Sequence, residues 1–287
     1  MRVLIAGCNG QLGRALQATA PAGAIIVAPP RAEFDITDAD AARAVVAAAR
    51  PDVVINAAAY TAVDKAEGDE AAARRVNVNA VGTLAAAARV AGACFVHVST
   101  DFVFDGTGHR PYPPDAPTNP LGVYGRTKLD GEIAAVEFHA DPLIVRTAWV
   151  YAAAGTNFVH TMLRLMRSRP AIGVVADQIG SPTHAPALAD TLWALIAGSH
   201  TGLFHATDAG VASWYDFAVA IHEEALGLGL LTSPVVVQPL RTEDYPTPAK
   251  RPAYSVLDKT ATWAITGPAR HWRDELRTCL ETMKEGA

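Results

Sequence analysis

A glycine-rich turn near the start of the chain constrains the fold more than any other feature. Residues 3–6 (Val-Leu-Ile-Ala) predict a buried strand, and a Gly-x-x-Gly-x-x-Gly segment follows it at once. A helical segment begins at Arg14, so the order is strand, turn and helix, as in a dinucleotide-binding unit. Gly7 permits the tight turn, Gly10 lets a pyrophosphate approach the helix N-terminus, and Gly13 lets the helix pack on the sheet. An ordinary strand-to-helix loop is the alternative.

The second predicted strand, residues 24–28, indicates which dinucleotide would bind. An NAD-binding unit usually has an acidic residue about 20 positions after the turn, which holds the ribose 2′-hydroxyl. No acid ends this strand, and Arg31 follows it after two prolines. Because a guanidinium suits a 2′-phosphate, NADPH is favoured and NADH is kept as the second choice. A solvated surface arginine is the alternative for Arg31. Asp38 is then expected to cap a helix over residues 39–49.

Further apolar runs predict a parallel sheet. The predicted strands are residues 53–55, 95–101, 143–147 and 203–205, the last returning to the main sheet from later in the chain. The predicted fold class is α/β, a Rossmann-type doubly wound parallel sheet with a smaller C-terminal α/β substrate lobe. We expect residues 1–150 to form the NADP(H)-binding domain and residues 151–287 to form mainly the substrate lobe. Helices of the second part are expected near residues 157–167, 187–197 and 214–226.

Tyr124 and Lys128 lie four residues apart, so on a helix they share one face. A phenol with a pKa of about 10 is a poor acid at neutral pH, and a nearby ammonium favours the phenolate. The pair therefore suits a proton donor to a carbonyl that is being reduced, with a solvated helix face as the alternative. Thr100 ends a predicted strand, where ligands of open α/β sheets sit. Its hydroxyl is expected to hold a substrate carbonyl oxygen, unless it only caps the next turn.

Composition and charge exclude several classes of protein. Half of the 287 residues are apolar and the net charge is −5, so nothing electrostatic favours nucleic acid or an anionic membrane as partner. The three cysteines are too few and too scattered for a disulfide framework, and the nine histidines show no metal-ligand spacing. No apolar run is long enough to span a bilayer, and the N-terminus enters a strand directly rather than a signal peptide. We therefore expect a cytoplasmic protein.

Taken together, the motifs resemble those of the extended short-chain dehydrogenase/reductases. The shared residues are the Gly7/Gly10/Gly13 turn, Asn56-Ala57-Ala58-Ala59, Ser99-Thr100 and the pair Tyr124 and Lys128. Within that superfamily the closer resemblance is to the dTDP-4-dehydrorhamnose reductases, in blocks that cover nearly the whole chain. These blocks are residues 7–13, 56–67, 99–106, 120–132, 146–151, 177–183 and 251–258.

The resemblance implies roles for the matching positions. Thr100, Tyr124 and Lys128 would be the catalytic set, and Lys128 would also hold the nicotinamide ribose hydroxyls. The residues implied at the cofactor, with Arg31 added by the charge argument, are Gly7, Gly10, Gln11, Leu12, Arg31, Asp35, Ile36, Ala57, Ala58, Ala59, Thr61, Tyr124 and Lys128. The residues implied at the sugar are Thr100, Asp101, Phe104, Trp149 and Arg251. For Arg251, an ordinary surface ion pair is the alternative.

The activity that the resemblance implies is NADPH-dependent reduction of the C4 keto group of dTDP-4-dehydro-β-L-rhamnose to dTDP-β-L-rhamnose, in dTDP-L-rhamnose biosynthesis. The partner would then be a small nucleotide sugar. One alternative is a nucleotide-sugar epimerase or dehydratase of the same superfamily, and another is a catalytically silent NADP-binding regulatory subunit. Some relatives dimerise with a metal at the interface, so a homodimer and a need for Mg²⁺ are left open. The sequence itself does not support a Mg²⁺ site.

Overall fold

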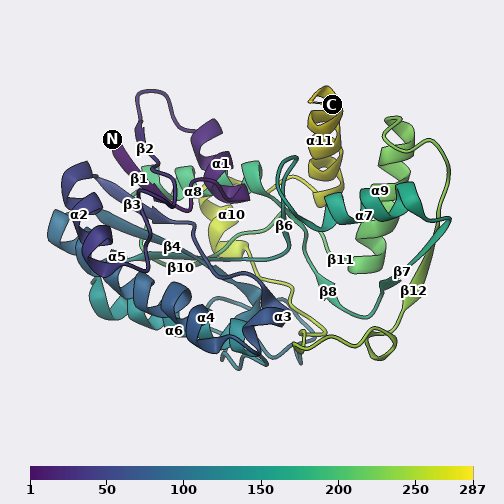
Figure 1. Ribbon diagram of the computed structural model, residues 1–287, viewed down its shortest axis with the longest axis horizontal. Helices are drawn as coiled ribbons and strands as arrows, with labels where there is room; N and C mark the ends of the chain where they lie inside the picture. Colours follow the sequence, from purple (N-terminus) through teal and green to yellow (C-terminus); the bar gives the residue numbers. More distant parts are fainter. Residues whose placement is uncertain (287) are drawn as a thin grey trace.

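The computed structural model describes residues 1–286 and is built around a six-stranded parallel sheet (Figure 1). Its strands are β1 (Arg2–Ala6), β2 (Ile25–Val27), β3 (Val53–Asn56), β4 (Cys94–Thr100), β5 (Leu143–Thr147) and β10 (Gly202–His205). The strand order is β10-β5-β4-β3-β1-β2. Since β1 lies between β2 and β3, the chain reverses its direction of travel across the sheet at β1. Ligands of open parallel sheets bind at such a reversal, beyond the carboxyl ends of the strands.

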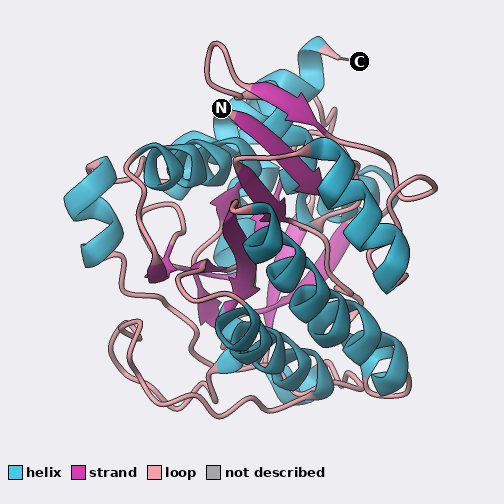
Figure 2. Ribbon diagram, turned by 90° about the vertical axis from the view of Figure 1, so that its left-hand side faces the viewer, coloured by secondary structure: helices cyan, strands magenta, loops and turns pink. Residues whose placement is uncertain are grey.

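Helices cover both faces of this sheet (Figure 2). One face packs against α2 (Ala39–Ala49), α5 (Ala80–Ala91) and α6 (Val123–Phe138), and the other against α1 (Gln11–Ala18) and α8 (Ala185–Ala197). Successive residues of a strand point to opposite faces. In β1, Leu4 belongs to the core under α2 and α5, whereas Val3 and Ile5 belong to the core under α1 and α8. A strand covered on both sides must be apolar throughout, which explains the unbroken apolar run in β1.

The second lobe lies beside the sheet, on the right of Figure 1. Its helices are α7 (Phe158–Ser168), α9 (Trp214–Gly227) and α11 (Trp272–Glu285). Its short strands pair as β6 (Val150–Tyr151) with β9 (Thr183–His184), β7 (Ala171–Val175) with β12 (Val236–Leu240), and β8 (Ile179–Gly180) with β11 (Ala212–Ser213). Phe217, Ile221 and Leu276 are fully buried in a separate apolar core between these elements. The lobe therefore has its own packing and is more than an extension of the sheet.

Short elements complete the chain and shape the edge of the sheet. They are α3 (Val63–Ala66), α4 (Glu70–Arg74), the π-helical turn η1 (Arg75–Asn79), the 3₁₀ turns η2 (Asp101–Val103) and η3 (Thr242–Asp244), and α10 (Thr260–Thr266). η2 follows β4 directly, so the chain turns sharply at the carboxyl end of that strand. This turn positions the side chains that follow Thr100.

Two elements, α2 and β10, confirm expectations from the sequence. The helix expected over residues 39–49 is α2, and Asp38 caps it by accepting hydrogen bonds from the backbone N–H groups of Asp40 (3.1 Å) and Ala41 (3.0 Å). The strand expected near residue 203 is β10, which pairs with β5. Two helices from the second half, α8 and α10, also pack with the sheet elements. The division of the chain at residue 150 stays a prediction.

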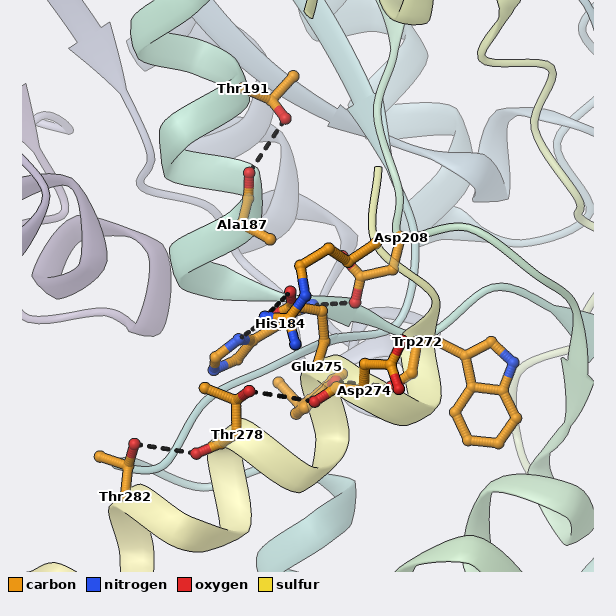
Figure 3. Close-up of polar contacts among 11 residues, drawn as sticks. His184, Ala187, Thr191, Asp208, Trp272, Asp274, Glu275, Thr278 and Thr282 are labelled. Atoms are coloured by element: carbon orange, nitrogen blue, oxygen red, sulfur yellow. Dashed lines mark hydrogen bonds and ion pairs between the residues drawn. The ribbon is translucent and has the colours of Figure 1, made fainter. Parts of the chain in front are cut away.

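α11 is joined to the start of α8 by a buried polar cluster (Figure 3). His184 Nδ1 lies 2.8 Å from Glu275 Oε2, and Arg270 forms an ion pair with the other oxygen of Glu275 at 2.9 Å. The backbone N–H of His184 donates to Asp208 Oδ2 at 2.9 Å. Burial raises the pKa of Asp208 to about 8, and the N–H of His184 opposes this rise. The folded protein therefore favours the neutral form of this carboxyl group.

We expect Asp208→Asn to stabilise the protein relative to the wild type, by an amount that grows as the pH rises. Because the pKa is higher in the folded state, folding takes up a proton between the ordinary aspartate pKa of 3.8 and about 8, and stability falls across this window. Asparagine keeps the acceptor for His184 N–H without the charge. The melting temperature should exceed that of the wild type by at least about 2–4 °C at pH 8, the shift from ~1 kcal/mol in a domain of 150–250 residues. Thermal unfolding at pH 5 and pH 8 measures this difference in melting temperature, with Asp190→Asn, a change at an exposed residue, as control. A difference in melting temperature that does not grow with pH would contradict the prediction.

Candidate active site

α6 holds Tyr124 against the carboxyl end of β4. The backbone N–H of Val123 donates to Glu67 Oε1 at 2.8 Å, which fixes the start of the helix. A Cβ added at Gly125 would lie 2.3 Å from the carbonyl oxygen of Phe102, so only glycine lets α6 approach η2 this closely. The ring of Phe102 meets Tyr124 edge-on, with centroids 5.4 Å apart. The structure therefore brings together the strand end and the phenol that were predicted to act together.

Thr100 and Asp101 form a buried polar pair beside this phenol. Thr100 Oγ1 donates to Asp101 Oδ1 at 3.0 Å and accepts from the backbone N–H of Phe102 at 3.3 Å. The cap expected as the alternative role of Thr100 is thus present. Burial raises the pKa of Asp101 to about 6, against hydrogen bonds from Ser255 and Thr100 that favour the carboxylate. The hydroxyl that was predicted to hold a substrate oxygen is therefore already hydrogen-bonded to a carboxyl group that titrates near neutrality.

The environment of Tyr124 differs from the expectation. Burial raises its pKa to about 12, the nearby Thr100 hydroxyl opposes this rise, and the charge of Asp101 adds to it. Lys128 was expected to lower this pKa, yet among the described residues it is not one of the groups that shift it. The Lys128 side chain is directed to another partner, since its Nζ donates to the Val98 carbonyl oxygen at 2.7 Å. Tyr124 therefore keeps its proton throughout the ordinary pH range.

Lys128 is itself almost fully buried, with 2% of its surface exposed. Burial lowers its pKa to about 8, and the negative charge of Glu132 partly offsets this. Both oxygens of Glu132 accept from the Arg146 guanidinium, at 2.8 Å and 2.6 Å, and one also accepts from Ser99. The negative charge of Glu132 is therefore already neutralised by Arg146, and Lys128 lies next to this ion pair.

The glycine-rich turn lies at the point where the sheet order reverses. Gly7 has a φ of +82°, which favours glycine, and a Cβ added there would lie 2.7 Å from the backbone nitrogen of Ala58. The turn after β1 thus touches the loop after β3. Gly10 is the N-cap of α1 and has no side chain to cover the first turn of the helix. The exposed backbone at a helix N-terminus fits a pyrophosphate, as the predicted cofactor requires.

The remaining cofactor candidates surround this turn in different ways. Leu12 and Ile36 have buried side chains, so these two residues contribute mainly packing. Ala57, Ala58 and Ala59 are partly exposed and Thr61 is exposed, in the loop that follows β3. The side chain of Arg31 is 82% exposed and lies 3.6 Å from Asp35, which also accepts from the backbone and hydroxyl of Thr37. Arg31 is thus accessible, with an acidic neighbour that a 2′-phosphate would have to displace or tolerate.

The substrate candidates divide into accessible and inaccessible residues. Trp149 has a φ of +49° and stacks on Trp214, with ring centroids 3.5 Å apart and planes within 6°. A non-glycine residue in this region costs about 1–3 kcal/mol and such strain clusters at functional sites. Phe104 is fully buried and stacks on Tyr112 at 4.2 Å, with the Arg146 guanidinium 5.2 Å from its ring. Phe104 and Asp101 are both closed to solvent, so their contact with the sugar stays a prediction.

Arg251 is occupied by an ion pair. Its Nη1 and Nη2 donate to the two oxygens of Asp64, at 3.1 Å and 2.8 Å, and it also bonds Thr247 and the Ala249 carbonyl. The hydrogen bonds from Arg251 and the Ala249 N–H hold the pKa of Asp64 below its ordinary value, although burial opposes this. The ion pair that was kept as the alternative for Arg251 is therefore present. Its role toward substrate stays a prediction.

Two buried polar residues near the site, Asn56 and His97, had no predicted role, whereas the predicted cofactor residue Gln11 is partly buried. Gln11 reaches the second lobe, where its Oε1 accepts from Asn157 at 2.8 Å. Asn56 and His97 are fully buried and bonded to each other at 3.2 Å. A polar residue inside an apolar strand must find a partner when buried. That signal was available for His97, which interrupts the apolar run of β4.

Among residues 1–286, no group of three or more His, Cys, Asp or Glu side chains is arranged to hold a metal ion. In the same described part of the chain, none of the helices combines the length and the apolar character needed to cross a membrane.

The parallel sheet, the glycine turn at its reversal point, and Tyr124 beside Thr100 define a Rossmann-type protein of the short-chain dehydrogenase/reductase class. The family model described as the RmlD substrate binding domain matches residues 1–285. The chain is 46% identical to a dTDP-4-dehydrorhamnose reductase of Burkholderia thailandensis over 296 residues, covering 99% of each chain. It therefore belongs to the dTDP-4-dehydrorhamnose reductase family.

Solved structures agree with this assignment. A dTDP-4-dehydrorhamnose reductase from Clostridium acetobutylicum superimposes with a TM-score of 0.93 at 39% identity, covering 99% of this chain and 100% of that one. The corresponding enzyme from Bacillus anthracis, solved in complex with NADP, gives 0.92 at 36% identity and covers 98% and 99% of the two chains. A UDP-glucose 4-epimerase from Thermus thermophilus is only 19% identical at a TM-score of 0.82, so it shares the fold alone.

Proposed function

We propose that this protein reduces the C4 keto group of dTDP-4-dehydro-β-L-rhamnose with NADPH and releases dTDP-β-L-rhamnose. One observation carries the proposal: a chain 46% identical over 99% of its length to a reductase of this name holds Tyr124 of α6 against the end of β4, where Thr100 lies. The reaction belongs to dTDP-L-rhamnose biosynthesis. Its substrate is a nucleotide sugar, and its cofactor is a nicotinamide dinucleotide.

The turn after β1 is the part of the chain that would accommodate the cofactor pyrophosphate. The uncovered backbone at Gly10 and the start of α1 would hold the pyrophosphate, while the loop that follows β3 would line the cofactor further on. The reduced nicotinamide supplies hydride chemistry at the sugar C4 when it is bound. Lys128 would hold the ribose hydroxyls, because its ammonium carries three donors. The relative that binds NADP supports NADPH over NADH as the working cofactor.

The residues of this chain supply the proton for the reaction. Tyr124 is protonated because burial raises its pKa to about 12, so it arrives at the reaction as an acid and gives its proton to the developing C4 oxygen. The Thr100 hydroxyl would hold that oxygen in place. Trp149 and Asp101 would contact the sugar, and the lobe formed mainly by residues 151–287 would cover it.

The proposed function is tested by NADPH oxidation with purified protein. Turnover is expected with dTDP-4-dehydro-β-L-rhamnose, and much less with the 4-keto sugars of GDP and UDP. The product should carry a new C4 hydroxyl, with one NADPH consumed for each sugar. An epimerase or dehydratase would convert its sugar without net oxidation of the cofactor. A silent regulatory subunit would bind NADPH and show no turnover with any of these sugars.

We expect Arg31→Ala to weaken NADPH binding and leave NADH binding nearly unchanged. A 2′-phosphate that bonds a guanidinium would lose about 1.5–3 kcal/mol of binding free energy, the worth of hydrogen bonds to charged groups. Dissociation constants of both cofactors for wild type and variant provide the measurement. Arg43→Ala is the matched control, because Arg43 is also exposed and paired with an aspartate but lies in α2. An equal loss for both cofactors would mean that Arg31 does not recognise the phosphate.

A further inference from the structure

The side chain of Gln11 reaches from the glycine turn into the second lobe. Gln11 is the first residue of α1, which begins where the pyrophosphate is expected to bind. Its Oε1 accepts from Asn157 Nδ2 at 2.8 Å, and its Nε2 lies 3.5 Å from the Val150 carbonyl oxygen. Asn157 Nδ2 also donates to the Ala152 carbonyl at 2.8 Å. Segment 150–157 of the second lobe therefore holds a side chain of the predicted cofactor site.

The orientation of both amide groups follows from a backbone partner. Asn157 is the N-cap of α7, and its Oδ1 accepts from the backbone N–H of His160 at 3.1 Å. Because an N–H group only donates, the atom that faces it is the amide oxygen, and the NH₂ group of Asn157 faces Gln11. The Gln11 atom next to that NH₂ group must then be the oxygen. The single acceptor atom of the Gln11 side chain is therefore bonded to the second lobe.

This acceptor atom starts beside backbone groups that need a partner. The first N–H groups of a helix have no partner within the helix, and Gly10, the N-cap of α1, has no side chain to cover them. Side chains of a helix lean toward its N-terminus, so a free Gln11 oxygen would lie within reach of these donors. Side-chain oxygens at a helix start accept from such N–H groups. A free Gln11 would thus compete with a pyrophosphate for the same donors.

We propose that Asn157 is a positioning residue of the cofactor site: it holds the Gln11 oxygen in the second lobe and so keeps the first turn of α1 open to NADPH. The cofactor then binds the form with the Gln11–Asn157 hydrogen bond more tightly than the form without it. Because a ligand favours the state that it binds more tightly, NADPH stabilises this bond and with it segment 150–157. The inference rests on the proposed function, in which NADPH is the cofactor.

Segment 150–157 has two anchors that can be separated by mutation. The middle of the segment, residues 154–156, is exposed. On one side, Nε2 of His160 donates to the Ala153 carbonyl at 2.9 Å, a bond to α7 that does not involve Gln11. On the other side, the bond between Asn157 and Gln11 joins the segment to α1. Removing one anchor at a time therefore distinguishes the proposed role from a general loosening of the segment.

The first test follows backbone hydrogen exchange of the full-length protein by mass spectrometry, with and without saturating NADPH. In the wild type, NADPH should slow exchange in the glycine turn and also, by about 2–10-fold, in segment 150–157, the range set by the net worth of one hydrogen bond. Asn157→Ser should keep the slowing in the turn and lose it in the segment. Serine keeps the cap of α7, because its hydroxyl can accept from the His160 N–H.

The second test is direct titration of NADPH. Asn157→Ser should weaken NADPH binding by about 2–10-fold, because the freed Gln11 oxygen then competes for the first turn of α1. Gln11→Met removes this acceptor, so adding Asn157→Ser to Gln11→Met should change the dissociation constant by less than about twofold. An unchanged dissociation constant for Asn157→Ser, or an equal loss in both backgrounds, would overturn the proposal.

The matched control is His160→Phe, which removes the other anchor of the same segment. It should speed exchange in segment 150–157, yet NADPH should still slow that exchange by the wild-type factor and bind with the wild-type dissociation constant. If His160→Phe behaves as Asn157→Ser does, or if NADPH slows exchange in the turn but not in the segment of the wild type, the inference is overturned. Both tests omit the sugar. A protein that does not bind NADPH would therefore overturn the proposed function together with the inference, whereas failure with the sugar alone would overturn only the proposed function.

Discussion

Replacing Tyr124 with phenylalanine is expected to lower kcat by about 10²-fold or more, the usual worth of a positioned general acid. The phenol is the group at the strand end that keeps its proton, because burial raises its pKa to about 12. Phenylalanine keeps the edge-on packing against Phe102 and removes only the hydroxyl. The loss should therefore appear in kcat, while the dissociation constant of NADPH stays within about twofold, since ~0.4 kcal/mol is a twofold change.

Single-turnover and steady-state rates with a saturating nucleotide sugar measure the effect, together with direct titration of NADPH. Tyr245→Phe is the control, because Tyr245 is exposed and lies in the segment after η3. A Tyr124→Phe enzyme with nearly normal kcat would show that another group donates the proton. Asp101 would then be the first candidate, since burial raises its pKa to about 6.

Most of the fold could be predicted because the rules involved are local. An apolar run followed by spaced glycines and a helix specifies a strand, a tight turn and a helix start within twenty residues, and β1 and α1 form there. Asp38 before an alanine-rich segment gave the start of α2. The packing of α8 and α10 with the sheet was not predicted. An amphipathic pattern says that a helix has an apolar face, but the partner of that face depends on residues far away in the sequence.

The candidate site, like the fold, could be predicted only in part. Thr100 and Tyr124 could be recognised because a strand end and a helix face each place a side chain by local geometry, and α6 brings the two together. The direction of Lys128 could not be predicted, since spacing on a helix says which face a side chain shares but not which acceptor it finds. Lys128 turns to the Val98 carbonyl, and Arg251 turns to Asp64. In each case the partner lies more than 25 positions away, so the local pattern could not identify it.

The second large effect concerns the Thr100 hydroxyl. Thr100→Ser should retain most of the activity, and Thr100→Val should lose about 2.7–4 kcal/mol of transition-state stabilisation, the range for a hydrogen-bond donor at a developing oxyanion. Serine keeps the hydroxyl, whereas valine keeps the branched shape and removes the donor. The expected loss appears in kcat as roughly 10²–10³-fold, because each 1.36 kcal/mol is tenfold in rate.

A structural role for Thr100 predicts a different outcome, and the two can be separated. The hydroxyl also accepts from the Phe102 N–H and donates to Asp101, so Thr100→Val removes a cap from η2 as well. Loss of a cap costs about 1 kcal/mol of stability, which lowers the melting temperature without touching the chemistry of a folded enzyme. We therefore measure kcat and thermal unfolding for both variants under conditions where each is fully folded. If Thr100→Val melts at a lower temperature but keeps its kcat, Thr100 is only a cap. If kcat falls by 10²-fold or more in the folded variant, the hydroxyl holds the substrate oxygen, because a loss of this size is expected for an oxyanion donor.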